Sequence, residues 1–340
     1  MRAKSGKSFW LGVDLGQEIL EVSLAAVGTP LERWRTLPLG RFDNTLSGLQ
    51  EMIVWVGRQL PKGGRLAGIC VESTGRLSFR FAEALASLEP LSPAVSIINP
   101  KRSLDFARSL GVGDKSDRID AAILALFGVT YQPSVTMALP ESYRRLRELG
   151  RLRERLQTEL FGLENTLRDS DDAFVCQSLS RCIAPLRKEI ERIEAEARRI
   201  VREDPQLARD VRLLDSIKGI GFLTAWILLA ELGDLRHYSR TQIVARVGLY
   251  PRLYASGKSV WRKPRLVKGG GALVRKALYN AARSIFRSKD NTLKTYLDRL
   301  GDRNKSAMDC LAALMRKLLL IARSVLIQEK PYDPHYRQNP

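Results

Sequence analysis

The chain has 340 residues, of which 44% are hydrophobic, and this is enough to build two packed domains. It carries 56 basic and 37 acidic residues, a net charge of +19, and no apolar run approaches the roughly 20 residues of a membrane span. Four cysteines without a Cys-x-x-Cys pair and only two histidines argue against a zinc site and favour a reducing, cytoplasmic location. No apolar signal-peptide core follows the basic start. Any bound metal is expected to be a hard cation held by carboxylates.

The first third of the sequence predicts a mixed sheet. Apolar runs predict strands over 9–14, 19–26 and, more weakly, 34–39. A helix with Asn44 as its N-cap follows over 45–60. The next predicted elements are a strand over 66–72, a helix over 77–86, a strand over 94–98 and helices over 101–109 and 117–128. Three strands and then helix–strand–helix–strand–helix is the order of the ribonuclease-H-like fold.

Four acids fall where such a sheet collects its functional residues. Asp14 and Glu72 each end a buried strand, whereas Asp117 and Asp120 lie three residues apart on one helix face. Four carboxylates in a small volume repel one another unless cations neutralise them, so the pattern predicts a site for Mg²⁺ or Mn²⁺ that acts on phosphodiesters. In the alternative interpretation, Asp117 is only an N-cap and Asp14 only a turn residue.

A second fold shares this strand order. The Val13–Gly16 segment also resembles the first phosphate loop of actin-like ATPases and sugar kinases. That fold needs further glycine-rich nucleotide loops, which the sequence lacks, and it gives the pair of acids in the Asp-x-x-Asp helix no role.

Two long helices are expected in the middle of the chain. Leucines at spacings of three and four over 141–168 predict an amphipathic helix, and a second helix follows over 175–203 with Pro185 inside it. The seam either packs within the monomer or forms a dimer, and the dimer is the expectation. Ile217–Gly221 then matches the hairpin of helix–hairpin–helix modules, in which glycines let backbone N–H groups approach a phosphate. An ordinary turn between helices is the alternative.

The last third holds almost all of the excess charge. Residues 236–340 contain 23 basic and 6 acidic residues, and no acid occurs from Leu235 to Lys289. Such a field attracts nucleic acid, and the interleaved aromatic residues suit stacking on bases. A solvated basic loop is the alternative. The middle of this stretch is a small polar turn over Tyr254–Ser259 between apolar segments.

A series of short motifs resembles one known family over residues 10–335. The family is the transposases of insertion-sequence family 110, which include bridge-RNA-guided recombinases, together with the related Piv-type DNA invertases. The motifs that carry the resemblance are Gly12–Asp14, Val71–Gly75, Ile98–Pro100, Lys115–Ala121, Ile217–Gly221, Val247–Pro251, Tyr254–Gly257, Leu273–Tyr279 and Met315–Leu318.

The resemblance implies an α/β RuvC-like domain over 1–130, a coiled-coil assembly region over 141–205 and a mostly α-helical transposase domain over 206–335. It implies that Asp14, Glu72, Asp117 and Asp120 bind Mg²⁺ or Mn²⁺, and that Ser256 is a nucleophile that forms a phosphoserine intermediate. The implied partners are donor and target DNA, a non-coding bridge RNA, and further copies of the chain as a dimer or as a tetramer on DNA. The implied location is the bacterial cytoplasm at the nucleoid. The residues expected to contact nucleic acid are Lys218, Gly219, Gly221, Arg252, Tyr254, Lys258, Arg262, Lys263, Arg265, Lys268, Arg275 and Lys276.

Three other functions fit parts of the sequence. A hydrolytic RuvC-like junction resolvase would use water as its nucleophile and leave Ser256 with a structural role, but it has no need of the basic C-terminal third. A DNA invertase would act without a guide RNA. A non-catalytic architectural protein would bind DNA through the same charge, but it has no need of four intact acids.

Overall fold

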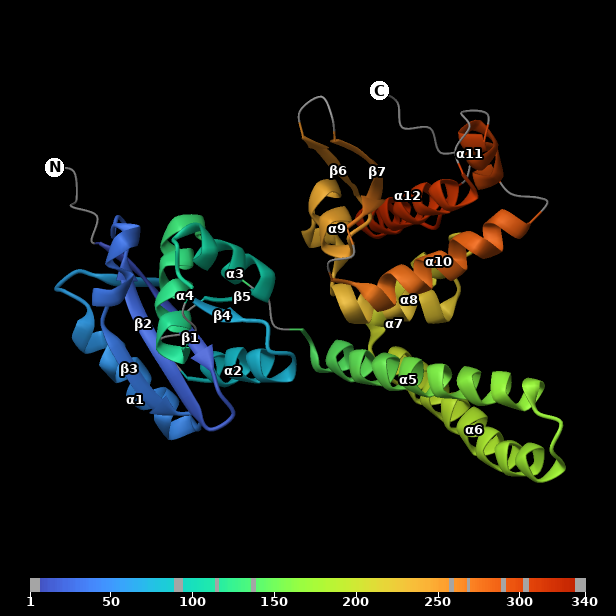
Figure 1. Ribbon diagram of the computed structural model, residues 1–340, viewed down its shortest axis with the longest axis horizontal. Coiled ribbons are helices and arrows are strands. Elements are labelled where there is room, and N and C mark those ends of the chain that lie inside the picture. Colours follow the sequence, from blue (N-terminus) through green and yellow to red (C-terminus); the bar gives the residue numbers. More distant parts are fainter. Residues whose placement is uncertain are drawn as a thin grey trace. The chain divides into compact units, whose positions relative to one another are not determined.

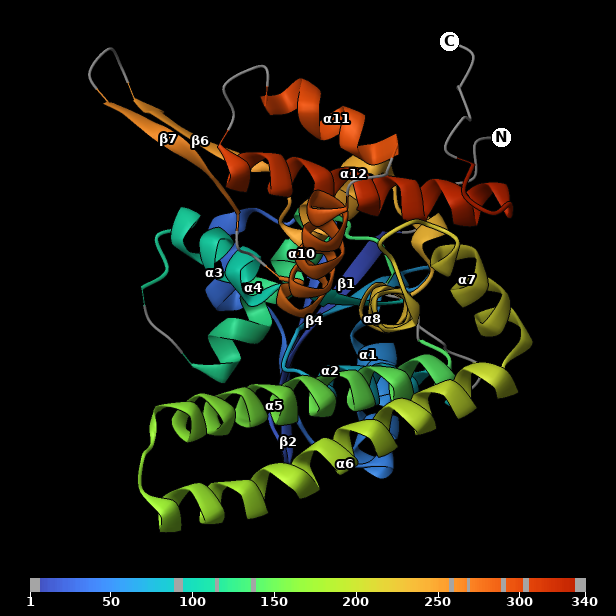
Figure 2. The same cartoon turned by 90° about the vertical axis from the view of Figure 1, so that its right-hand side faces the viewer.

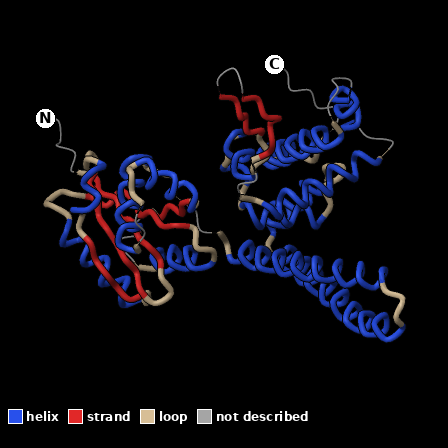
Figure 3. Tube along the Cα trace, viewed as in Figure 1, coloured by secondary structure: helices blue, strands red, loops and turns tan. Residues whose placement is uncertain are grey.

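The computed structural model describes residues 7–88, 94–113, 116–135, 139–256, 260–267, 270–288, 292–301 and 306–333 (Figure 1). The chain divides into two compact units, residues 1–138 and 139–340. Figure 3 shows that the first unit mixes strands with helices, whereas the second is mainly helical. No helix in the described ranges is both long enough and apolar enough to cross a membrane.

A mixed sheet organises the first unit. Its strands, within the described residues, lie in the order β3-β2-β1-β4-β5. β1 pairs antiparallel with β2, and β2 with β3, whereas β1, β4 and β5 run parallel. The parallel pairs are joined through helices, as parallel neighbours require. The strands are β1 (Ser8–Leu15), β2 (Ile19–Ala26), β3 (Leu39–Asp43), β4 (Arg65–Glu72) and β5 (Val95–Ile98).

Helices cover both faces of this sheet. One core packs Leu11 and Val13 of β1 against α1 and α2. The other packs Trp10 of β1 and Cys70 of β4 against α3 and α4. Neighbouring residues of β1 thus enter different cores, because successive side chains of a strand point to opposite faces. The helices are α1 (Leu46–Gln59), α2 (Arg76–Ala86), α3 (Pro100–Ser109) and α4 (Asp117–Tyr131).

The third strand lies later in the chain than the sequence predicts. Leu31–Thr36 forms a short 3-10 helix, η1, and β3 begins only at Leu39, so the predicted strand over 34–39 is wrong. β3 is an edge strand whose side chains alternate between exposed and half-buried. It therefore lacks the continuous apolar run that identifies the buried strands in the sequence.

The predicted N-cap of α1 is also wrong by one residue. Thr45 caps the helix, because its hydroxyl accepts the N–H of Gly48 at 3.2 Å. Asn44 instead donates its side-chain amide to the carbonyl oxygen of Gly16 at 2.9 Å. Its side-chain amide therefore stabilises the turn between β1 and β2 and does not cap the helix.

A helical hairpin opens the second unit. α5 (Glu141–Asp169) and α6 (Ala173–Glu203) lie side by side in Figures 1 and 2, and α6 remains helical through Pro185. Leu160 of α5 is 5% exposed and packs in one cluster with Ile183 and Ile190 of α6. The buried part of the leucine seam is therefore packed within one chain, whereas Leu152 of the same helix is 46% exposed.

α8 lies at the centre of the core of the second unit. Its Trp226 is fully buried, and the indole N–H donates to the carbonyl oxygen of Leu146 at 2.9 Å, which joins α8 to α5. α7 and α10 pack against α8, and α12 packs against both of them. The remaining elements are α7 (Pro205–Asp215), α8 (Phe222–Leu232), η2 (Leu235–His237), α9 (Arg240–Val247), β6 (Pro251–Ser256), β7 (Val260–Leu266), α10 (Ala272–Arg287), α11 (Thr292–Gly301) and α12 (Ala307–Gln328).

Candidate active site

A row of charged residues crosses one end of the sheet in the first unit. Asp14 at the end of β1 is the register partner of Glu21 on β2, and Glu21 is the register partner of Arg41 on β3. On the other side of β1, the parallel register with β4 places Glu72 next to Asp14. The two acids that end parallel strands therefore share one edge of the sheet.

The other two predicted acids lie in the first turn of α4. Ser116 is the N-cap of this helix, and its hydroxyl accepts the N–H of Ile119 at 3.4 Å. Asp117 is therefore not the N-cap, so the interpretation that gave it only this role is wrong. Asp117 and Asp120 both lie in the turn whose exposed N–H groups favour negative charge.

The position of α4 depends on glycines. Gly12 and Asp14 lie on the same face of β1, because they are two residues apart on a strand. A Cβ atom at Gly12 would collide with the backbone of α4 at Ala125, and one at Gly128 would lie 2.7 Å from the ring of Trp10. α4 thus lies directly on β1, and Asp117 at its N-terminal end reaches the same pocket as Asp14.

This pocket has a volume of about 310 Å³. The residues that line it include Asp14, Glu21, Asp117 and Arg41. Glu72 and Asp120 are not part of the lining. Glu72 instead accepts a hydrogen bond from the hydroxyl of Ser103, a buried residue of α3.

The donor chemistry of the four predicted acids fits a hard divalent cation, because carboxylate oxygens are the ligands that Mg²⁺ and Mn²⁺ prefer. Their spacing in this structure is wider than a closed site requires. Among the residues that the structure describes, no three acidic, cysteine or histidine side chains lie close enough together to hold one metal ion.

Glu21 is a site residue that the sequence prediction missed. It is only 8% exposed, although it is an acid within a mostly apolar strand. Its carboxylate lies 3.5 Å from Nε of Arg41 and 3.8 Å from Nε of Arg118. The signal was present in the sequence, since a hairpin that turns at residues 16–18 places Glu21 opposite Asp14.

Ser256 is in the second unit. It is the last residue of β6, and its backbone is paired with that of Val260 at the start of β7. The described strands end at these two residues, so Ser256 lies at the end of a two-stranded ribbon. The predicted turn over 254–259 is wrong for Tyr254–Ser256, which belong to β6, and residues 257–259 lie outside the described residues.

The same ribbon carries other predicted contacts with nucleic acid. Arg252 pairs in register with Arg265, and Tyr254 with Arg262. These two strands lack a clear strand pattern in the sequence, because the segment is rich in charge and β7 contains Pro264. The predicted contacts on the ribbon are Arg252, Tyr254, Arg262, Lys263 and Arg265, whereas Lys258 and Lys268 lie outside the described residues.

The predicted helix–hairpin–helix turn joins α7 to α8. Gly219 has a φ of +93°, and a Cβ atom there would lie 2.7 Å from the side chain of Ile285 on α10. This glycine is therefore needed both for its backbone conformation and for close packing against α10. Gly221 is the N-cap of α8 without a side-chain cap, and both it and Lys218 are exposed. The N–H groups at this end of α8 are of the kind that bind phosphate.

Two further residues predicted to contact nucleic acid have protein partners. The guanidinium of Arg275 donates to the carbonyl oxygens of Gly270 and Val247, the latter at 2.8 Å, and its partial burial lowers its pKa. Lys276 forms an ion pair with Glu154 of α5. Both cations therefore have intramolecular partners in this structure.

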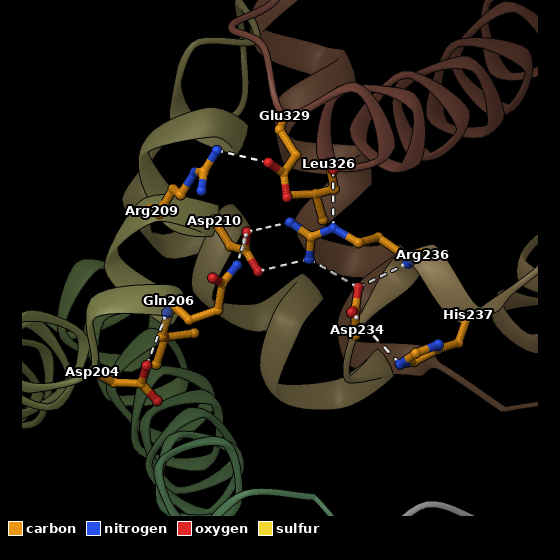
Figure 4. Close-up of polar contacts among 10 residues, drawn as sticks. Asp204, Gln206, Arg209, Asp210, Asp234, Arg236, His237, Leu326 and Glu329 are labelled. Carbon is orange, nitrogen blue, oxygen red and sulfur yellow. Dashed lines mark hydrogen bonds and ion pairs between the residues drawn. The ribbon is translucent and has the colours of Figure 1, made fainter.

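The first cation of the acid-free stretch is also neutralised. Figure 4 shows Arg236 of η2 between Asp210 of α7 and Asp234, with Leu326 of α12 close by. Its terminal nitrogens lie 2.6 and 3.0 Å from the two carboxylate oxygens of Asp210, and Nε donates to the carbonyl oxygen of Leu326 at 3.0 Å. The hydrogen bonds to Asp210 raise the pKa of Arg236. This cluster joins α7, η2 and α12.

A larger cavity, of about 1220 Å³, lies between α11, α12 and the base of the β6–β7 ribbon. Nζ of Lys317 lies 4.0 Å from the ring centre of Tyr296, and burial together with the nearby Arg299 lowers the pKa of Lys317. The cavity adds basic charge beside the ribbon. Its basic lining residues are Arg240, Arg299, Arg316, Lys317 and Lys330, and its acidic ones are Asp309 and Asp333.

Comparison with known proteins places this chain in a family. A transposase model for the DEDD domain of IS110 elements matches residues 11–170, and the model of the transposase IS116/IS110/IS902 family matches residues 211–298. The pilin gene-inverting protein of Moraxella bovis is 25% identical over 325 residues, which are 95% of this chain and 97% of that protein. The protein of the same name from Moraxella lacunata matches to the same extent.

Two transposases match over shorter stretches. The transposase of insertion sequence element IS1111A from Coxiella burnetii is 31% identical over 128 residues, 36% of this chain and 34% of that protein. The transposase of insertion sequence element IS1328 from Yersinia enterocolitica is 28% identical over 206 residues, 50% of this chain and 58% of that protein. The two family models and these relatives agree, and the chain therefore belongs to the IS110 family of DNA transposases.

Proposed function

We propose that this transposase cuts and rejoins DNA at specific sites with a RuvC-like carboxylate site in the first unit and Ser256 of the second unit as nucleophile. The observation that carries the proposal is the meeting of Asp14 and Asp117 in one pocket, with Glu72 on the neighbouring strand at the same sheet edge. The strand order β3-β2-β1-β4-β5, with its single switch from antiparallel to parallel pairing at β1, supports the RuvC-like assignment.

Asp14, Glu72, Asp117 and Asp120 are the proposed ligands of Mg²⁺ or Mn²⁺. A bound divalent ion would offset negative charge on the phosphate that is attacked. The residues themselves would supply oxygen ligands from two strands and one helix. The carboxylate of Glu72 accepts a hydrogen bond from Ser103 in this structure.

The proposed reaction exchanges one phosphodiester for another. The Ser256 hydroxyl oxygen attacks the phosphorus, the bond from phosphorus to the leaving deoxyribose oxygen breaks, and the serine proton is transferred to that oxygen. The phosphoserine conserves the energy of the cleaved bond, and attack by a second DNA hydroxyl regenerates the serine. Arginines on the same ribbon as Ser256 would offset phosphate charge.

The experiment is a trapping reaction on a suicide DNA substrate, followed by mass spectrometry of the protein. We expect a phosphoserine adduct at Ser256 that is absent from Ser256→Ala and present in Ser259→Ala, the matched control from the same segment. Asp14→Asn is expected to bind DNA but to give no adduct. Cleavage that persists in Ser256→Ala with free ends made by water would instead establish the hydrolytic resolvase.

A structured RNA is the proposed guide for target choice. The +17 charge of residues 236–340, the basic ribbon and the cavity with basic lining residues support nucleic-acid binding beyond the cleavage site. Recombination by the purified protein should stop after RNase treatment and return when the copurifying RNA is added back. Sequence-specific recombination that survives RNase would favour an RNA-independent invertase. The name of the Moraxella relatives describes gene inversion by those proteins.

Assembly is the remaining part of the proposal. The domain roles are assigned to residues 1–130, 141–205 and 206–335, and the α5–α6 hairpin is the assembly region. Because the carboxylates and Ser256 belong to different compact units, a dimer or a DNA-bound tetramer could build each active site from two protomers. Mixing Asp14→Asn with Ser256→Ala tests this: two inactive variants should restore partial activity together if the site is shared.

A further inference from the structure

We propose that Arg41 and Arg118 bind the DNA backbone on either side of the carboxylate pocket, and that the buried Glu21 positions both of them. The inference rests on the proposed function, since it takes the pocket of Asp14 and Asp117 as the place where DNA is cut. It assigns roles to Glu21, Arg41 and Arg118, three charged residues that have no role in the proposed function.

The geometry begins with Glu21, which is 8% exposed and lies between two guanidinium groups from different elements. Its Oε1 is 3.5 Å from Nε of Arg41 on β3, and its Oε2 is 3.8 Å from Nε of Arg118 on α4. One nearly buried carboxylate thus pairs with two cations that remain largely open to solvent, since the side chains of Arg41 and Arg118 are 59% and 65% exposed.

The donors of these arginines remain available to a ligand. Separations of 3.5 and 3.8 Å are ion pairs beyond normal hydrogen-bond length, and a guanidinium carries five N–H donors. Glu21 offsets one of the two positive charges, so these three groups together carry a net charge of about +1, whereas Asp14, Glu18 and Asp117 add negative charge to the same pocket. A phosphate is therefore expected on the solvent-exposed sides of the two guanidinium groups, beside the acids of the pocket and not among them.

The ligand that suits this arrangement is the phosphodiester backbone of DNA. Arginine binds phosphate oxygens through paired N–H donors, and the chain belongs to a family of DNA transposases. Arg41 lines the pocket together with Asp14 and Asp117, so a phosphate that it holds would lie beside the proposed cleavage site. Arg118 follows Asp117 in the first turn of α4, so a phosphate bound there would also order the turn that carries the two α4 acids.

The test measures the salt dependence of DNA binding by the full-length chain. We expect the double variant Arg41→Gln/Arg118→Gln to lower the slope of log affinity against log salt by about 1.4–1.8, because each lost phosphate contact removes about 0.7–0.9. Arg58→Gln is the control for each single replacement, Arg41→Gln or Arg118→Gln, since it removes one positive charge from an exposed position on α1, which packs on the opposite face of the sheet. An unchanged slope in the double variant would overturn the proposal.

A second measurement tests the positioning role of Glu21. Glu21→Gln keeps both arginines, so the salt slope should stay unchanged while the cleavage rate at saturating DNA falls by about tenfold to a hundredfold. Glu51→Gln, which changes an exposed acid of α1 outside this pocket, is its control. A full cleavage rate in Glu21→Gln at saturating DNA would contradict the role. If Asp14→Asn abolishes cleavage while these arginine variants behave like the control, the proposed function stands and only this inference fails.

Discussion

The backbone of Ala121 occupies the place where a side chain of Gly12 would be. A Cβ atom at residue 12 would collide with the carbonyl oxygen of Ala121, so α4 can lie on β1 only while position 12 has no side chain. The contact fixes how far the first turn of α4 extends over the end of β1. The separation between the carboxylates of Asp14 and Asp117 is thus set by a glycine that carries no functional group.

Replacing Gly12 with alanine is expected to push α4 off the sheet. The strain should destabilise the first unit by about 1–3 kcal/mol, which is the usual cost of overpacking a core. DNA cleavage should fall further than the loss of folded protein explains, because Asp117 moves with the helix. Urea unfolding and the cleavage rate of the folded fraction measure the two effects.

Gly57→Ala is the control for this change. Gly57 lies within α1, and a Cβ atom there meets nothing within 4 Å. Alanine should therefore stabilise the helix by about 0.5–1 kcal/mol and leave cleavage unchanged. Equal unfolding midpoints for the two variants would show that the contact between α4 and β1 is not tight.

The ion pair of Asp210 and Arg236 should be a main support of the second unit. Asp210 is 1% exposed, so Asp210→Ala leaves the partly buried guanidinium of Arg236 with fewer partners. We expect a loss of about 3 kcal/mol in the free energy of unfolding, which is typical when one partner of a buried pair is removed. Arg209→Ala, which breaks the half-exposed pair with Glu329, should cost less than about 1 kcal/mol. Urea unfolding would compare the two, and similar costs would contradict the assignment.

Neighbouring positions on α5 should respond differently to an introduced charge. Leu160 is 5% exposed in the seam with α6, whereas Phe161 is 61% exposed. Leu160→Asp should open the distal part of the hairpin, because burying an unpaired carboxylate costs several kcal/mol. Limited proteolysis should then cut α5 or α6, whereas Phe161→Asp should stay resistant. Resistance in both variants together with a smaller assembly in Leu160→Asp would favour a seam between protomers.

Burial should make one thiol inert. Burial raises the pKa of Cys70 from an ordinary value of 9.0 to about 12, whereas Cys182 is exposed. At pH 8 a thiol with a pKa of about 12 is ionised in about one molecule in ten thousand, so a maleimide should label Cys182 quickly and Cys70 only after unfolding. Rapid labelling of Cys70 in the native protein would contradict its place in the core.

The same shift has a consequence for stability at high pH. The unfolded thiol ionises near pH 9 and the folded one near pH 12, so the unfolded state loses its proton first. The stabilising contribution of the neutral thiol is therefore complete below about pH 9 and is lost as the pH rises toward about 12. Cys70→Ala should show a weaker loss of stability over this window in chemical unfolding than the unmodified chain.

The sequence predicts the parts of this fold whose patterns are local. Buried strands such as β1 and β4 are continuous apolar runs, and α4 and α5 have clear helical patterns, so their positions are predicted within a few residues. β3 and the β6–β7 ribbon escape prediction, because their pairing depends on a partner strand rather than on their own composition. Glu21 is missed for a related reason, since only the pairing of β2 with β1 places it opposite Asp14.

The α5–α6 hairpin has a consequence for how this protein could change in length. Its distal part has its own apolar cluster around Leu160, Ile183 and Ile190, separate from the core that contains Trp226. Removing seven residues from each helix would preserve the alternation of apolar positions and shorten the hairpin by about 10 Å. The hairpin is therefore a spacer whose reach is adjustable in whole heptads, while the elements that carry the proposed nucleophile keep their own core.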